Sequence, residues 1–211
     1  MPRNLNNEIY HTSSGSPVVL KWSVMLNGKR HIKINGDKIN VSNNYDVFET
    51  QYNICETAWN NKGNGLVSVV HSSFSSSNVD VAMPTSNYWQ QTMQGDRYYD
   101  LGHCLLSDTN DNEIDSLATA LNSTRNINYA AIFLNPDDDF FKYRNSNELN
   151  TTLIKYTIVH EVGHALTLGH PNGEYNTMYV DSVMNTDVVA ESLSYYLPQV
   201  HDNNDLIAKY G

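Results

Sequence analysis

Short runs of β-branched and aromatic residues, separated by polar turns, characterise the first two thirds of the chain. Residues 18–26 form one such run, VVLKWSVML, and residues 31–34 form another. The dipeptide Asn27-Gly28 lies between them, and Asn-Gly favours a two-residue hairpin turn because both residues readily adopt positive φ. The pattern therefore predicts an early β-hairpin.

Further runs of the same character predict strands later in the chain, each bounded by polar residues. They are residues 66–70 (LVSVV), 79–83 (VDVAM), 129–135 (YAAIFLN) and, with a weaker pattern, 104–106 (CLL).

Apolar residues recur at three- and four-residue steps in two longer segments, which is the period of an amphipathic helix. The first lies between Asn44 and Asn61, and Gly63 and Gly65 follow it as helix breakers. The second runs from about Glu148 to Leu168, after an Asn-rich loop that offers N-caps. A short closing helix is expected over residues 202–210, which begin with acidic residues and precede a terminal glycine.

The chain has 211 residues, enough for one domain to bury a core without disulfide support. We expect a flexible N-terminal arm over residues 1–17, which are mostly polar, and a single domain over residues 18–211. The formal net charge is -10, with no cluster of Lys and Arg, which argues against nucleic acid or an anionic membrane as partner. No signal peptide or membrane-spanning run is visible in the sequence.

The two cysteines, Cys55 and Cys104, permit at most one disulfide bond and exclude a disulfide-based scaffold. Their wide separation leaves open whether they pair.

The segment HEVGHALTLGH at residues 160–170 carries the most specific chemistry in the chain. On a helix, residues four apart share one face, so His160 and His164 can direct ring nitrogens at one ion, with Glu161 beside them. A catalytic zinc ion takes three protein ligands and keeps a fourth position for water. The spacing therefore predicts a zinc site that needs a third ligand.

His170 is the expected third ligand. A continuous helix would carry it about 9 Å along the axis from His164, so the helix must end between them. Gly169 lies in this interval and can take a left-handed turn at little steric cost. Glu191, 27 residues after His164, is the rival third ligand, but His170 matches the spacing better.

These residues make the chain resemble the metzincin metalloproteases, whose motif H-E-x-x-H-x-x-G-x-x-H is matched by His160, Glu161, His164 and His170. It is most similar to the matrixins and their small bacterial relatives. The resemblance implies a single α+β metzincin-like domain, with a twisted mixed β-sheet, an active-site helix and a C-terminal helix. It also implies one catalytic zinc ion per chain and a secreted, monomeric endopeptidase acting on proteins or peptides, in which Glu161 activates a zinc-bound water.

Two details of the motif leave alternatives open. The family's glycine position holds Thr167, so either Thr167 adopts a strained positive φ or Gly169 makes the turn. The methionine turn that the resemblance implies below the metal could be formed by Met184 or by Met178, and we favour Met184 because of its Ser-x-Met context.

The same residues are compatible with functions other than proteolysis. A recognition or adhesion module that keeps the zinc ion but does not cleave peptides is the main alternative, although Glu161 would have little purpose in it. Residues 108–115 and 137–139 are rich in oxygen ligands and could hold Ca²⁺, but both are better interpreted as exposed turns. The remaining histidines are isolated in the sequence and were assigned no metal role; they are His11, His31, His71, His103 and His201.

Overall fold

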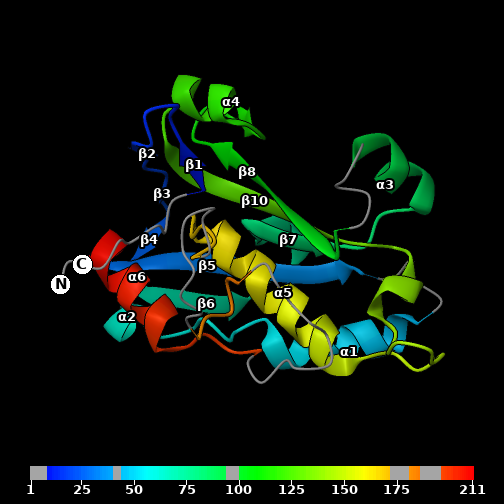
Figure 1. Cartoon of the computed structure of the whole chain (residues 1–211). Helices are drawn as coiled ribbons and strands as arrows, with labels where there is room; N and C mark the ends of the chain where they lie inside the picture. The colour runs from blue at the N-terminus through cyan, green and yellow to red at the C-terminus, as the bar shows by residue number, and fades with distance from the viewer. Residues whose placement is uncertain (1–8, 40–43, 94–99, 172–180, 186–195) are drawn as a thin grey trace.

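The computed structural model describes residues 9–39, 44–93, 100–171, 181–185 and 196–211, which form a mixed β-sheet with helices packed around it (Figure 1). The strands are β1 (Tyr10–His11), β2 (Pro17–Val18), β3 (Lys21–Trp22), β4 (Met25–Leu26), β5 (Lys29–Lys38), β6 (Val67–His71), β7 (Val79–Ala82), β8 (Gly102–Asp108), β9 (Glu113–Ile114) and β10 (Asn126–Leu134). The helices are α1 (Tyr45–Cys55), α2 (Lys62–Gly65), α3 (Ser86–Thr92), α4 (Leu117–Asn122), α5 (Thr151–Ala165) and α6 (Val200–Tyr210).

The main sheet has eight strands with the order β4-β5-β7-β10-β8-β9, while β6 pairs with β5 and β3 pairs with β10. Strands β5, β6, β7 and β10 run parallel to their neighbours in this group, whereas β8 is antiparallel to β10 and β9 is antiparallel to β8. The fold is therefore an α+β arrangement built on a mixed, open sheet. Strands β1 and β2 form a separate antiparallel pair.

The expected hairpin is confirmed at Asn27-Gly28. Strands β4 and β5 pair antiparallel across this dipeptide, and the two residues have φ of 51° and 78°. The residues before β4 do not form one continuous strand, because β2, β3 and β4 pair with three different partners. The turn chemistry thus determined the hairpin, whereas tertiary pairing divided the preceding run.

Helix α5 packs against strands β8 and β10 and against helix α1, and its buried residues form much of the core (Figure 1). Trp59 fixes the position of this helix, since its indole Nε1 donates a hydrogen bond to the Val159 carbonyl at 2.8 Å. Phe48 of α1 meets Phe141 edge to face at a centroid distance of 5.1 Å. Trp59 thus connects the segment after α1 to α5, and Phe141 connects the segment before α5 to α1.

Three expectations about secondary structure need correction. The first helix ends at Cys55 and not near Asn61, because the Asn61 backbone N–H donates to the Val67 carbonyl at 3.0 Å and draws the chain towards β6. Helix α5 spans Thr151–Ala165, shorter at both ends than expected. Short elements α3, α4 and β9 were not predicted. No described helix is both long and apolar enough to cross a membrane.

Candidate metal centre

Helix α5 carries three of the four predicted site residues. Its N-cap is Asn150, whose side-chain oxygen accepts hydrogen bonds from the backbone N–H groups of Thr152 and Leu153, both at 3.1 Å. This cap satisfies two of the N–H groups that a helix leaves without an internal partner. His160, Glu161 and His164 then follow on the last two turns of the helix, which ends at Ala165.

The turn after α5 is made by Thr167, which has φ of 64°, and Gly169 is not among the described residues with positive φ. Thr167 N–H donates to His164 O at 2.7 Å, and Leu168 N–H donates to Gly163 O at 3.0 Å. These are the two hydrogen bonds of a Schellman motif, which usually places glycine where Thr167 stands. A left-handed conformation costs a β-branched residue about 1–2 kcal/mol, so Thr167 holds a strained backbone.

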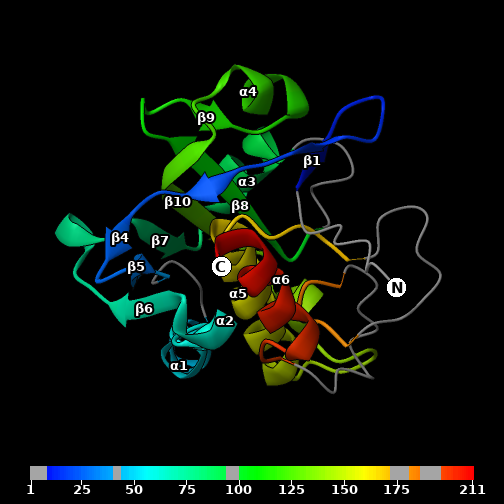
Figure 2. The same ribbon diagram turned by 90° about the vertical axis from the view of Figure 1, so that its left-hand side faces the viewer.

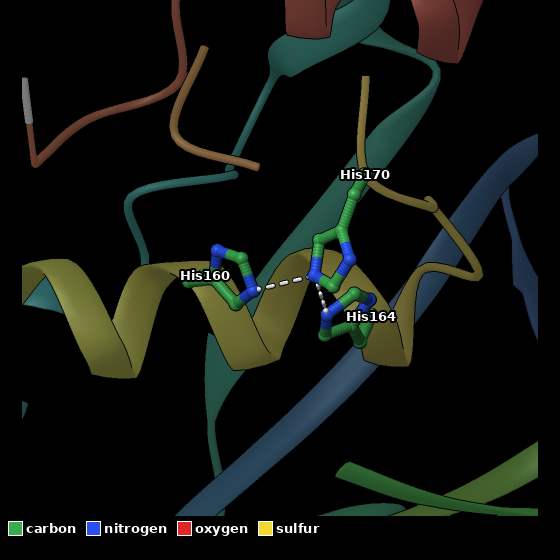
Figure 3. A group of neighbouring side chains, drawn as sticks. All are labelled: His160, His164 and His170. Atoms are coloured by element: carbon green, nitrogen blue, oxygen red, sulfur yellow. Dashed lines mark hydrogen bonds between the residues drawn. The ribbon is translucent and has the colours of Figure 1, made fainter. Parts of the chain in front are cut away.

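The turn returns the chain to the helix and brings the three predicted ligands together (Figure 3). His170 Nε2 lies 3.1 Å from His160 Nε2 and 3.0 Å from His164 Nε2. The three histidines offer ligand atoms that all lie within 4.8 Å of one another. A tetrahedral zinc ion with Zn–N distances of about 2.1 Å would hold such nitrogens about 3.4 Å apart. The separation of these rings suits one small divalent ion.

The backbone determines which ring nitrogens face this space. His160 Nδ1 lies 2.8 Å from the Val183 carbonyl oxygen, and His164 Nδ1 lies 2.8 Å from the Leu168 carbonyl oxygen. A carbonyl accepts and never donates, so Nδ1 carries the proton in both rings and their Nε2 lone pairs point towards His170. The single Nε2 proton that a neutral His170 could carry would satisfy only one of them. Converging lone pairs of this kind fit a metal cation.

Burial also keeps these rings neutral. It lowers the pKa of His160 to about 3, with a further contribution from His170, and lowers the pKa of His170 to about 4. The pKa of His164 is lowered well below its usual value by burial and by the other two imidazoles. Neutral imidazole is the form that binds metals, so the three histidines are ready to ligate at neutral pH.

Glu161 is buried in the same cleft, next to strand β8. Burial and the nearby Asp100 raise the pKa of its carboxyl to about 8. Gly102 permits the close approach of β8, because a Cβ at this position would lie 2.8 Å from Glu161 Cγ and 2.9 Å from Thr157 Cγ2. The carboxyl group is therefore held between α5 and the first residue of β8, where a cation bound by the neighbouring histidines would favour its ionised form.

The cleft has a volume of about 480 Å³ and extends from the three histidines along β8. Gly102, His103 and Cys104 line it beside Glu161, and Leu106 and Ile114 line its apolar end together with residues from the N-terminal segment. Sequence reasoning assigned no role to His103 and did not identify Tyr156. The Tyr156 hydroxyl donates to the Asn185 carbonyl and lies 3.3 Å from His160 Nδ1. Its position one helical turn before His160 was the available signal.

Residues 182–184 form a buried turn below the histidines. The carboxylate of Asp202, at the start of α6, accepts hydrogen bonds from Ser182 Oγ at 2.5 Å and from the Val183 N–H at 3.1 Å. Val183 in turn supplies the carbonyl that orients His160. Met184 is buried and packs against Gly163. Met178 and Glu191 lie outside the described residues, so the structure does not test them.

The cysteines and the acidic segments behave as structural features. Cys55 and Cys104 are both free. Asp108 is completely buried and not simply solvated: its carboxylate accepts from the backbone N–H groups of Asn110, Asn112 and Thr124 at 2.8 to 3.0 Å. The carboxylates of residues 137–139 lie within 4.8 Å of one another, but Lys142 pairs with two of them, Asp138 at 3.9 Å and Asp139 at 2.5 Å, and no second feature indicates a cation there.

The other histidines with described side chains have ordinary partners or positions. His31 Nδ1 lies 3.2 Å from Ser68 Oγ, His71 pairs with Glu56 at 2.8 Å, and His201 lies 3.3 Å from Asp205. His103 lines the cleft but does not join the cluster of three histidines.

No protein-family model matches this chain, and no curated protein matches it. The case for its function therefore rests on the geometry of the site.

Proposed function

We propose that this protein is a zinc-dependent endopeptidase of the metzincin type, with His160, His164 and His170 as zinc ligands and Glu161 as the catalytic base. The observation that carries the proposal is the convergence of three Nε2 atoms in one cleft with a buried carboxylate. A zinc ion bound by three imidazoles would polarise a peptide carbonyl and lower the pKa of water in its fourth position.

The residues of the chain have separate roles in this reaction. Glu161 takes a proton from the attacking water and delivers it to the leaving amine as the peptide bond breaks. Val183 and Leu168 fix the orientations of His160 and His164 through their carbonyl groups. An extended peptide would lie along Gly102 to Leu105 of β8, so that backbone hydrogen bonds align its scissile bond with Glu161. The proposed enzyme acts as a secreted monomer on protein or peptide substrates.

The test compares the wild type with Glu161→Gln and Glu161→Ala in zinc content and in cleavage of an unstructured protein such as casein. We expect one zinc ion per chain in all three. We expect kcat/KM to fall by a factor of about 10² to 10⁴ in both variants, because each removes the group that moves the proton. The glutamine variant preserves the size of the side chain, so its loss of activity reports on the carboxylate itself.

Two other outcomes would reject the proposal. A wild type that contains no zinc would contradict the metal site. A wild type that binds zinc, but cleaves casein no faster than the glutamine variant, would favour the recognition module, in which the metal site serves binding alone. The position of the substrate is tested separately by the structure of a complex with a peptide analogue. A bound analogue without backbone hydrogen bonds to β8 would contradict the strand-addition model.

A further inference from the structure

Thr167 is connected to two parts of the chain that lie far away in the sequence. Its Oγ1 donates a hydrogen bond to the Leu20 carbonyl at 2.9 Å. Its own carbonyl accepts one from Lys209 Nζ at 2.5 Å, and its Oγ1 lies 3.0 Å from the Tyr210 hydroxyl. The side chain of Thr167 is completely buried, and Lys209 is only 6% exposed. Hydrogen bonds in such surroundings are strongly ordered because water cannot replace either partner.

Tyr210 extends the same network. Its hydroxyl donates to the Leu166 carbonyl at 2.7 Å and accepts from the Trp22 N–H at 3.2 Å. Leu166 is the C-cap of α5, so its carbonyl has no partner within the helix. The C-terminal end of α6 therefore contacts the two residues that follow α5, Leu166 and Thr167. In Figure 2 α6 lies in front of α5.

This turn determines the positions of two metal ligands. The Leu168 carbonyl, one residue after Thr167, orients His164, and the chain continues from there to His170. Because Thr167 is β-branched and has positive φ, its backbone is driven towards negative φ unless other contacts hold it. A change in this dihedral angle would move both the Leu168 carbonyl and His170. The ligand geometry thus depends on whatever fixes Thr167.

We propose that Lys209 and Tyr210 are positioning residues for the metal centre, which hold Thr167 in its left-handed conformation and so keep His164 and His170 in place for metal binding. The inference rests on the proposed metal site but not on peptide hydrolysis. The C-terminal end of α6 then maintains the affinity for the metal, which a helix packed only for stability would not do.

The first experiment measures the zinc affinity of the purified full chain by competition with a chromophoric chelator. Lys209→Met removes the ammonium group, whereas Tyr210→Phe and Thr167→Val each remove one hydroxyl group. All three variants change the shape of the side chain little. We expect each to bind zinc about 10- to 100-fold more weakly, as is typical when partners that orient metal ligands are removed. Unchanged affinity in all three would overturn the proposal.

Asn203→Ala is the matched control on the same helix. Asn203 accepts a hydrogen bond from the Gly63 N–H at 3.0 Å and so ties α6 to α2, away from the Thr167 turn. We expect this variant to lower the melting temperature of the metal-free protein while its zinc affinity stays within about threefold of the wild type, because no metal ligand depends on it. An equal loss of affinity in the control would show that α6 acts only through overall stability, and would overturn the proposal.

A second variant separates positioning from packing. Glycine adopts positive φ without strain, so in Thr167→Gly the turn should no longer depend on its contacts with Lys209 and Tyr210. We expect Tyr210→Phe to weaken zinc binding about tenfold in the wild-type background and less than about threefold in the Thr167→Gly background. Equal losses in the two backgrounds would overturn the positioning role. Failure of the wild type itself to bind zinc would reject the proposed function together with this inference, whereas zinc binding with unaffected variants would reject only the inference.

Discussion

Met184 packs against α5 at Gly163, the residue between the helical turns that carry His160 and His164. A Cβ at Gly163 would overlap the Met184 sulfur and would lie 2.9 Å from Trp59 Cζ2. The glycine therefore provides the space that lets a buried methionine support the metal-binding part of the helix. This relationship explains a helix-breaking residue inside HEVGH, where local propensity alone would favour alanine.

Gly163→Ala should destabilise the metal-free protein by about 1–3 kcal/mol, because overpacking outweighs the gain of about 1 kcal/mol in helix propensity. Urea denaturation in the presence of a chelator measures this change. In the double variant Gly163→Ala with Met184→Ala, the added methyl group partly fills the space that the methionine vacates. We expect the double variant to be more stable than the sum of the single effects predicts, and simple additivity would contradict the contact.

His164→Ala should reduce zinc affinity by at least about 100-fold, because it removes a direct ligand and not merely a partner that orients one. Chelator competition, with zinc content measured after dialysis, checks the result. His71→Ala is the control, since His71 is exposed and pairs with Glu56. Comparable zinc binding by the His164 variant and the control would contradict the ligand assignment.

Asp202→Asn should lower both stability and zinc affinity. The Asp202 carboxylate accepts from Ser182 Oγ, the Val183 N–H and, at 2.7 Å, the Gln199 N–H. An amide has only one acceptor oxygen, so at least one of these buried donors loses its partner, at a cost of about 1–3 kcal/mol. Displacement of Val183 would also misorient His160, and we expect about tenfold weaker zinc binding. Urea denaturation measures the change in stability, and chelator competition measures the change in zinc affinity. A loss of stability without a loss of affinity would show that Asp202 does not orient His160.

Asp108 gives a prediction about pH. Burial alone would raise the pKa of its carboxyl, but the N–H donors of Thr124, Asn112 and Asn110 outweigh burial and hold that pKa well below its ordinary value. A depressed folded-state pKa contributes stability that is present above the unfolded-state pKa of about 3.9 and is lost as the pH falls towards the folded-state value. Asp108→Asn should therefore destabilise the metal-free protein by about 2 kcal/mol at pH 7.

The difference between the wild type and Asp108→Asn should shrink below about pH 4, because the unfolded wild-type chain then takes up a proton at this carboxyl group while the folded protein does not, which favours unfolding. Urea denaturation at pH 7 and pH 3, with a chelator present at both, checks the sign. A difference that is equal at the two pH values would show that the hydrogen bonds of this loop do not depend on the charge of Asp108.

Local sequence patterns were sufficient for some elements because the relevant interactions span only a few residues. Asn27-Gly28 determined its hairpin through the backbone conformations that these residues prefer. The four-residue spacing of His160 and His164 placed both rings on one face of α5, and the tight return to His170 followed from the need to break the helix. Strand β8 is longer than the three-residue run that predicted it, because its pairing with β10 reaches from Gly102 to Asp108.

The sequence by itself thus determined the helix that carries the ligands, the identity of the three clustered histidines and the presence of a turn before His170. Only the tertiary structure decided that Thr167 makes this turn, that Met184 fills the space at Gly163, and that α6 contacts the end of α5. Leu20 and Lys209 are separated from Thr167 by 147 and 42 residues, respectively. No local preference would place threonine at positive φ; the conformation persists because distant hydrogen bonds and burial compensate for its strain.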